Sequence, residues 1–174
     1  MNRIKHPKAQ TGFTMVELIV VIVILGILSA VALPKFANLQ GDARVAKLNA
    51  ARGSVAAAAA MTHGAALARH NVNPQPACPA TGTVANINAA GNGTLCTENP
   101  ALIAITNLYP SASAAGIIAA AGIVTTEGYT VVAGNPITVR VTGAPTPASC
   151  QFTYAAAVAL NTAPVLTNSV VSGC

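Results

Sequence analysis

The chain has 174 residues, enough for one domain with an appendage, and its composition is unusual for a soluble enzyme. Hydrophobic residues make up 53%, whereas aromatic residues make up 3% and charged residues 7%, so a core must come from closely packed aliphatic side chains. The formal net charge is +5, but three of the nine basic residues lie in the first twelve positions, which leaves six basic against four acidic groups. Residues 13–174 therefore lack the basic face that nucleic-acid binding requires, and no specific nucleic-acid ligand is expected.

The few ionisable residues argue against catalysis and metal binding. The four acidic residues are scattered, and neither a Ser/His/Asp nor a Cys/His constellation can be assembled. No glycine-rich phosphate loop follows a predicted strand. His63 and His70 are seven residues apart and are expected at the surface, not as metal ligands. We expect no enzyme, cofactor or metal.

A short basic segment precedes a long apolar run. Residues 1–12 carry Arg3, Lys5 and Lys8, and residues 13–33 are apolar apart from Glu17 near their start. Twenty-one helical residues span about 31 Å, which matches the hydrocarbon thickness of a bilayer. Positive charges before the run favour an inside N-terminus. A secretory signal cut within 29–32 is the alternative, but the length of the run and Glu17 favour a retained segment.

The helical pattern continues beyond Pro34. Apolar residues recur at spacings of three and four, and an unbroken alanine run follows over 56–60. We therefore predict one helix from Thr14 to His70, kinked at Pro34, although a helix end at the proline is the alternative. The residues that carry this spacing are Phe36, Leu39, Ala43, Ala46 and Ala50.

The remainder of the chain predicts a head with little helix. Residues 71–100 indicate an irregular connection, and 101–123 indicate short helical pieces such as 113–121. A hairpin is predicted over 129–141, with further strands at 150–154 and within 164–171. Asn92 begins an Asn-Gly-Thr glycosylation sequon, but a tight turn there is favoured.

Four cysteines, Cys78, Cys96, Cys150 and Cys174, all lie after the predicted helix. None has zinc-ligand spacing, and an even number in an exported chain favours disulfides over free thiols. Three pairings are open. The sequential one, Cys78–Cys96 with Cys150–Cys174, closes two loops of modest size, each stabilising by about 3 kcal/mol.

The segment from Gly12 to Glu17 and the apolar run behind it resemble the type IV pilins and the type II secretion pseudopilins. The resemblance implies that prepilin peptidase cuts after Gly12 and N-methylates the new first residue, Phe13. It also assigns Glu17, which heads the apolar helix, to filament assembly. The match is dense over about 60 residues and includes Pro34.

Two further stretches are similar to the mannose-sensitive haemagglutinin branch of type IV pilins. They are residues 34–44 and the late Cys150 with the terminal pair Gly173-Cys174. Beyond residue 70 the resemblance is looser.

The physical chemistry is compatible with these roles. An ionised Glu17 is costly in an apolar run, and the free amine that cleavage exposes on Phe13 of a neighbouring copy would offset the cost while fixing axial register. Small residues at Gly26, Ser29 and Ala30 would let apolar helices approach closely. Open helical symmetry follows if each contact is heterologous.

We expect an α+β fold with a long bent N-terminal helix on an antiparallel sheet. The predicted divisions are a basic leader (1–12), a transmembrane and filament-core helix (13–33), an amphipathic helix (34–70) and a head (71–174). The expected function is that of a structural subunit of a type IV pilus, serving adhesion, motility or DNA uptake. Its implied partners are further copies of itself, prepilin peptidase, the assembly machinery of the inner membrane and, before assembly, lipid. It would lie in the inner membrane first and on an extracellular pilus later. A secretion pseudopilin and a monomeric membrane-anchored binding domain are the alternatives.

Overall fold

The computed structural model describes residues 13–72, 78, 85–96 and 102–174. The chain forms two compact units, Met1–Gln40 and Gly41–Cys174, which we call the N-terminal unit and the head. The predicted leader, including Gly12, lies outside the described residues.

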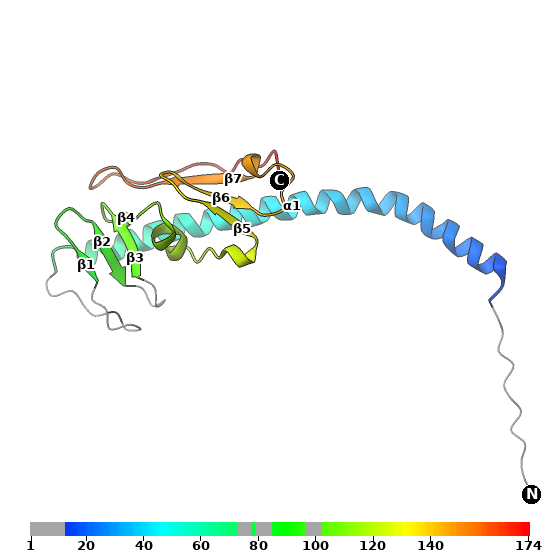
Figure 1. Cartoon of the computed structure of the whole chain (residues 1–174), viewed down its shortest axis with the longest axis horizontal. Helices are drawn as coiled ribbons and strands as arrows, with labels where there is room; N and C mark the ends of the chain where they lie inside the picture. The colour runs from blue at the N-terminus through cyan, green and yellow to red at the C-terminus, as the bar shows by residue number, and fades with distance from the viewer. Residues whose placement is uncertain (1–12, 73–77, 79–84, 97–101) are drawn as a thin grey trace, which may run out of the picture. The chain divides into compact units, whose positions relative to one another are not determined.

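Helix α1 runs from Met15 to Arg69 (Figure 1). Its bounds agree with the predicted Thr14–His70 to within one residue. Pro34 lies inside the helix, so it is not a terminator. α1 is bent, and Pro34 remains its predicted cause. The helix ends where Asn71 takes a left-handed conformation with φ of 64°, a common way to close a helix C-terminus.

The first part of the head after α1 is a four-stranded antiparallel sheet that the sequence did not predict. Its order is β1-β2-β3-β4, and Leu95 pairs with Ile103 at its centre. The expectation of an irregular connection over 71–100 is therefore wrong in part, and residues 102–106 and 109–110, within the stretch expected to hold short helical pieces, form strands instead. A short π-helical turn, η1 (Ala114–Ile118), lies within the expected helical piece at 113–121 and confirms it. The strands are β1 (Asn86–Ile87), β2 (Gly93–Cys96), β3 (Leu102–Thr106) and β4 (Tyr109–Pro110).

The second sheet confirms the predicted hairpin and both later strands. β5 (Tyr129–Val132) and β6 (Ile137–Val141) pair antiparallel, with Tyr129 opposite Val141. β7 (Gln151–Ala155) and β8 (Val165–Leu166) complete the order β5-β6-β7-β8. The head thus contains two sheets where one was expected. Short 3₁₀ turns, η2 (Thr125–Glu127) and η3 (Pro147–Ser149), flank β5 and β7.

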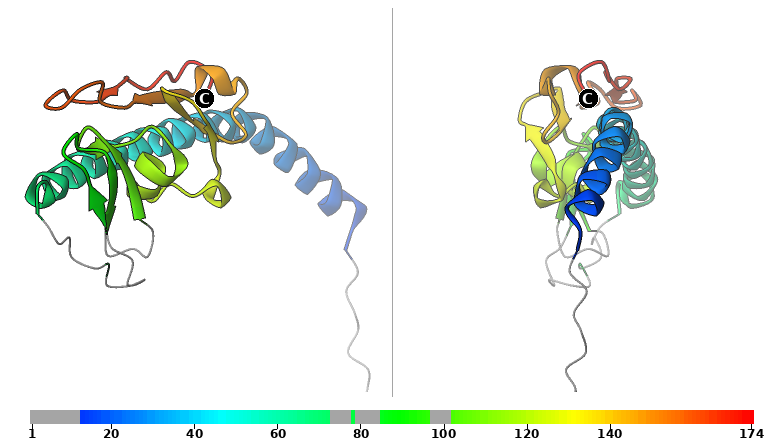
Figure 2. Two further views of the ribbon diagram at one scale, coloured as in Figure 1. Left: turned by 60° about the vertical axis from the view of Figure 1, so that its left-hand side comes forward. Right: turned by 90° about the vertical axis from the view of Figure 1, so that its right-hand side faces the viewer.

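Both sheets pack along the part of α1 that belongs to the head (Figures 1 and 2). Leu48 and Val55 of α1 pack with Phe152 and Tyr154 of β7 in the larger core. Further along α1, Ala66 packs with Leu95 and Ile103 in a smaller core. Alanines supply much of the helical surface, so the sheets approach the helix closely, as the composition predicts.

Candidate functional site

The apolar half of α1 is exposed along its whole length. The large hydrophobic side chains from Leu18 to Leu33 are between 45% and 68% exposed. Among the described residues there is one helix, α1, that is long enough and apolar enough to cross a membrane. A soluble monomer rarely leaves so large an apolar surface uncovered, so this surface indicates contact with lipid or with other chains.

The start of α1 is a reciprocal cap. The Glu17 backbone N–H donates to Thr14 Oγ1 at 3.2 Å. In return, the Thr14 backbone N–H and hydroxyl both donate to Glu17 Oε2 at 2.9 Å. This is a capping box, which satisfies N–H groups that the first helical turn leaves without partners. The single carboxylate near the apolar run is therefore held by its own chain.

Thr14 is a functional candidate that the sequence prediction missed. The signal was present, because Thr-x-x-Glu directly before an apolar run is the sequence signature of a capping box. Phe13 lies just ahead of the cap and is 81% exposed. Phe13 and Glu17 also line one surface groove with Val16, Val20 and Val21. The structure thus brings together the two residues that the resemblance assigns to assembly.

Comparison with known proteins bears on this same segment. A family model for the prokaryotic N-terminal methylation motif matches residues 7–33. The chain carries that motif. Over 50 residues the chain is also 46% identical to the type IV narrow pilus major component PilA5 of Thermus thermophilus. This match covers 29% of the chain and 43% of the relative, so the chain spans less than half of the relative's length. No solved structure matches.

Outside the methylation motif, basic side chains on α1 hold segments of the head through main-chain oxygens. Arg44 Nη1 donates to the Cys174 carbonyl at 2.9 Å, and Arg52 Nε donates to the Thr167 carbonyl at 2.7 Å. Lys47 donates to the carbonyl of Glu127. Arg44, Arg52 and Lys47 are therefore engaged within the chain.

Lys47 is fixed from two sides. Its Nζ lies 4.6 Å from the centre of the Tyr129 ring, a cation–π distance. Gly128, with φ of 79°, lets the amine approach, because a Cβ there would lie 2.7 Å from Nζ. Burial, and then the nearby Glu127 carboxylate, raise the pKa of the Tyr129 phenol.

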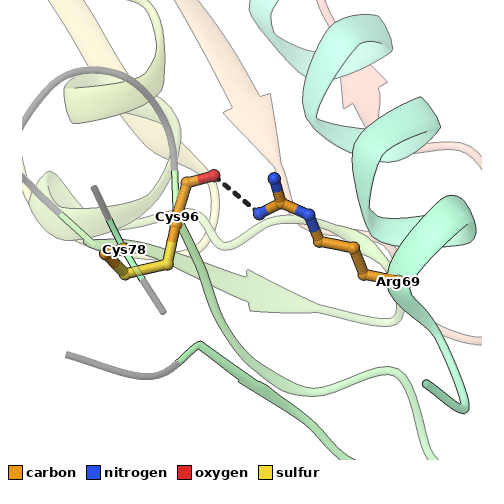
Figure 3. The surroundings of a disulfide bond; sticks show 3 residues. All are labelled: Arg69, Cys78 and Cys96. Carbon is orange, nitrogen blue, oxygen red and sulfur yellow. Dashed lines mark hydrogen bonds between the residues drawn. A yellow bond between two sulfur atoms is a disulfide. The ribbon is translucent and has the colours of Figure 1, made fainter. Parts of the chain in front are cut away.

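Two disulfides close the head, Cys78–Cys96 and Cys150–Cys174, with Cα separations of 5.3 and 4.9 Å. This is the sequential pairing. In each, one cysteine also binds an arginine of α1: Arg69 Nη1 donates to the Cys96 carbonyl at 2.9 Å (Figure 3), as Arg44 does to Cys174. The cross-links are thus attached to the helix.

His63 is not the surface group that was expected. It is half-buried, its Nδ1–H donates to the Leu108 carbonyl at 3.0 Å, and its ring stacks on Tyr109 with centroids 3.8 Å apart. The contact is structural. Within the described ranges, no group of three His, Cys, Asp or Glu side chains could hold a metal ion.

Asn92 lies in the turn that the sequence favoured over a glycan site. Its backbone N–H donates to Asn88 Oδ1, and its own Oδ1 accepts from the Asn107 N–H at 2.9 Å. The side chain is therefore used to join two loops of the first sheet.

Proposed function

We propose that the chain is the precursor of a type IV pilus filament subunit. The observation that carries the proposal is the exposed apolar first part of α1. It lies within the methylation motif, and Glu17 provides a carboxylate near its start. Polymerisation would bury this surface against the same helix of other copies. The similarity to a pilus major component over 50 residues supports the proposal. The role is structural and requires no catalysis.

Processing follows from the motif. Prepilin peptidase would cut between Gly12 and Phe13 and methylate the new amine of Phe13. Before assembly, residues 13–33 would span the inner membrane with the N-terminus in the cytoplasm, as the basic charges ahead of the span favour. After extraction by the inner-membrane assembly machinery, the subunit would lie in a pilus outside the cell.

The capping box suggests how Glu17 is handled before and after assembly. In a single subunit the Thr14 hydroxyl and N–H stabilise the carboxylate. In the filament, the Phe13 amine of a neighbouring copy would approach the same carboxylate. A charge pair in an apolar surrounding is stronger than in water, and a misplaced charge there is costly, so correct register is favoured.

The finer assignments rest on the sequence. We propose the mannose-sensitive haemagglutinin branch from residues 34–44 and from the cysteines near the C-terminus, and a role in adhesion, motility or DNA uptake. The two disulfides favour a fibre exposed outside the cell over a secretion pseudopilus, since a surface fibre must withstand shear and proteases.

Mass spectrometry and shearing test the proposal together. We expect a mature subunit that begins with methylated Phe13, and long fibres of this protein in the sheared supernatant. A different N-terminus would contradict the processing step. If the wild-type strain sheds no fibres and the deletion strain loses a secreted enzyme, the chain would instead be a secretion pseudopilin.

A further inference from the structure

Thr14 lies between the residue that is to be methylated and the first turn of α1. Phe13 and Thr14 are outside the helix, which begins at Met15. The Thr14 carbonyl accepts the first helical hydrogen bond, from the Leu18 N–H at 3.3 Å. Thr14 is therefore the N-cap residue of α1, and the non-helical backbone of an N-cap keeps Phe13 out of the first turn.

Every polar group of Thr14 has a partner within the chain. Its N–H and its hydroxyl donate to Glu17 Oε2, both at 2.9 Å, and its Oγ1 accepts from the Glu17 N–H at 3.2 Å. Its carbonyl oxygen is bound by the Leu18 N–H. Helix ends without such partners fray, whereas these bonds fix the peptide group of Thr14 against the start of α1.

The fixed peptide group of Thr14 in turn restricts the nitrogen of Phe13. The peptide bond that joins the two residues is planar, so a single soft dihedral, ψ of Phe13, separates this nitrogen from the Thr14 N–H. If Thr14 were not held, its own φ and ψ would also be free. The capping box thus limits the Phe13 nitrogen to a narrow arc beside the helix end.

The chemistry of N-methylation depends on how this nitrogen is oriented. Once the leader is removed, the nitrogen of Phe13 is a terminal amine. In methyl transfer from a sulfonium donor, the lone pair of the neutral amine forms a bond to the methyl carbon while the carbon–sulfur bond opposite it breaks. The amine becomes a methylammonium and the sulfonium becomes a neutral thioether. Because the attack must be in line with the breaking bond, a nitrogen held in place reacts faster than a mobile one.

The capping box leaves the Phe13 nitrogen available for this reaction. Both donors that bind Glu17 Oε2 belong to Thr14, so the box is complete without a bond from Phe13. Phe13 itself is 81% exposed, which leaves it open to an enzyme. The residue that reacts is therefore accessible, while the residue that follows it is fixed.

We propose that the capping box positions the Phe13 amine for N-methylation, and that Thr14 is the positioning residue. The inference rests on the proposed processing after Gly12. It gives Glu17 a role that precedes assembly and requires its carbonyl-type oxygen as an acceptor, not its charge, because glutamine completes a capping box as glutamate does. Leader removal does not depend on the cap in this way, since the uncut chain holds Phe13 from both sides.

Two pairs of substitutions in the full-length chain separate the cap from other roles of its residues. Thr14→Val removes the cap, whereas Thr14→Asn keeps a capping side chain without the hydroxyl. Glu17→Ala removes the acceptor, whereas Glu17→Gln keeps an acceptor without the charge. Ser29→Ala is the matched control, because it removes a hydroxyl from the same helix outside the capping box.

The measured quantity is the fraction of mature subunit that carries the methyl group, followed over time after pulse labelling by mass spectrometry. We expect Thr14→Val and Glu17→Ala to slow methylation about fivefold, in keeping with the usual effect of losing an N-cap. Thr14→Asn, Glu17→Gln and Ser29→Ala should be methylated at the wild-type rate. Cleavage after Gly12, read from the same spectra, should keep the wild-type rate in every variant.

The paired variants also define the results that would overturn the inference. Methylation of Thr14→Val at the wild-type rate would show that the cap is not needed. Methylation of Thr14→Asn as slow as that of Thr14→Val, or of Glu17→Gln as slow as that of Glu17→Ala, would show that the enzyme needs the hydroxyl or the charge itself. These results leave the proposed pilus subunit intact. A wild-type mature subunit without a methyl group on Phe13 would instead overturn the proposed processing and this inference together.

Discussion

At the scale of single residues, Thr14 changes the interpretation of Glu17. The resemblance to pilins implies that the Glu17 carboxylate has no partner until the amine of another subunit binds it. In the structure, the carboxylate already accepts two hydrogen bonds from Thr14. Assembly would then exchange or supplement an internal partner, which allows the subunit to stay in the membrane before a neighbour arrives.

Thr14→Val should weaken assembly without preventing insertion. Valine keeps the shape of threonine but removes the hydroxyl, so the Glu17 N–H loses its acceptor and Oε2 loses one of its two donors. We expect fibre yield to fall several-fold, less than in Glu17→Ala, while subunit in the membrane fraction stays constant. Thr14→Ser retains the hydroxyl and should assemble like the wild type. Equal yields from the valine and serine variants would contradict a role for the cap.

Tyr154 should make the head sensitive to alkaline pH. Burial, and then the neighbouring Tyr109, raise the pKa of its phenol, which donates to the Pro110 carbonyl at 2.7 Å. The unfolded chain therefore ionises first, near pH 10, and stability that is constant below that pH falls above it by up to about 1.4 kcal/mol per pH unit.

Tyr154→Phe separates the titration from the hydrogen bond. The variant should be less stable at neutral pH by about 1 kcal/mol, because the Pro110 carbonyl loses its donor, but its stability should fall less steeply above pH 10. Urea unfolding between pH 8 and 11 measures both effects. An unchanged alkaline slope would show that Tyr154 is not the group responsible.

At the scale of elements, α1 stabilises the head in two ways, through its buried apolar face and through its basic side chains. Its buried face packs on the sheets, and its basic side chains bind main-chain carbonyls of segments that are distant in sequence. Carbonyl oxygens accept hydrogen bonds from Arg and Lys side chains. The nearly neutral head can therefore bind its basic side chains although it has few carboxylates.

Arg52→Ala should release the segment after β8. The Arg52 guanidinium binds the Thr167 carbonyl and Asn168 Oδ1, at 2.7 and 3.2 Å, so its loss should increase amide exchange over residues 165–171. We expect a stability loss of about 1 kcal/mol, because the bonds are exposed. Arg52→Lys keeps the charge but not the planar fork and should be intermediate. Exchange that rises equally throughout the head would argue against a local clamp.

The elements that local sequence determines were predictable. A sustained 3.6-residue period with an alanine run determines α1, and apolar alternation determines β5 and β6. The sheet β1–β4 was not predicted, because two of its strands have two residues and the stretch that holds β1 and β2 is rich in Asn, Gly and Thr, which indicate turns.

The candidate sites divide in the same way. The capping box is local and could have been found from Thr14 and Glu17 alone. The stack of His63 on Tyr109 joins residues 46 positions apart. The apolar groove in the head exists because two sheets pack on one helix. Neither feature has a signal in the sequence.

At the scale of the whole molecule, the chain combines an exposed apolar segment with a head that is cross-linked twice. Cys150 is fully buried in the larger core, whereas Cys78 and Cys96 form a small cluster of their own with Ala85. The two disulfides span 24 and 18 residues, so loop entropy alone predicts nearly equal contributions of about 3 kcal/mol each. Their surroundings, not their loop lengths, should therefore distinguish them.

Removal of each disulfide in turn tests this difference. The double variant Cys150→Ala with Cys174→Ala should lose more stability than Cys78→Ala with Cys96→Ala, by about 1–2 kcal/mol, because it also leaves a cavity in the larger core. Urea unfolding of the full-length chain in detergent micelles gives the comparison, and the wild type under reducing conditions serves as the control for loss of both cross-links. Equal losses would show that loop closure dominates and that Cys150 contributes little as a core residue. A larger loss from the Cys78 pair would instead place the critical cross-link beside the first sheet, at the end of α1 where Arg69 binds Cys96.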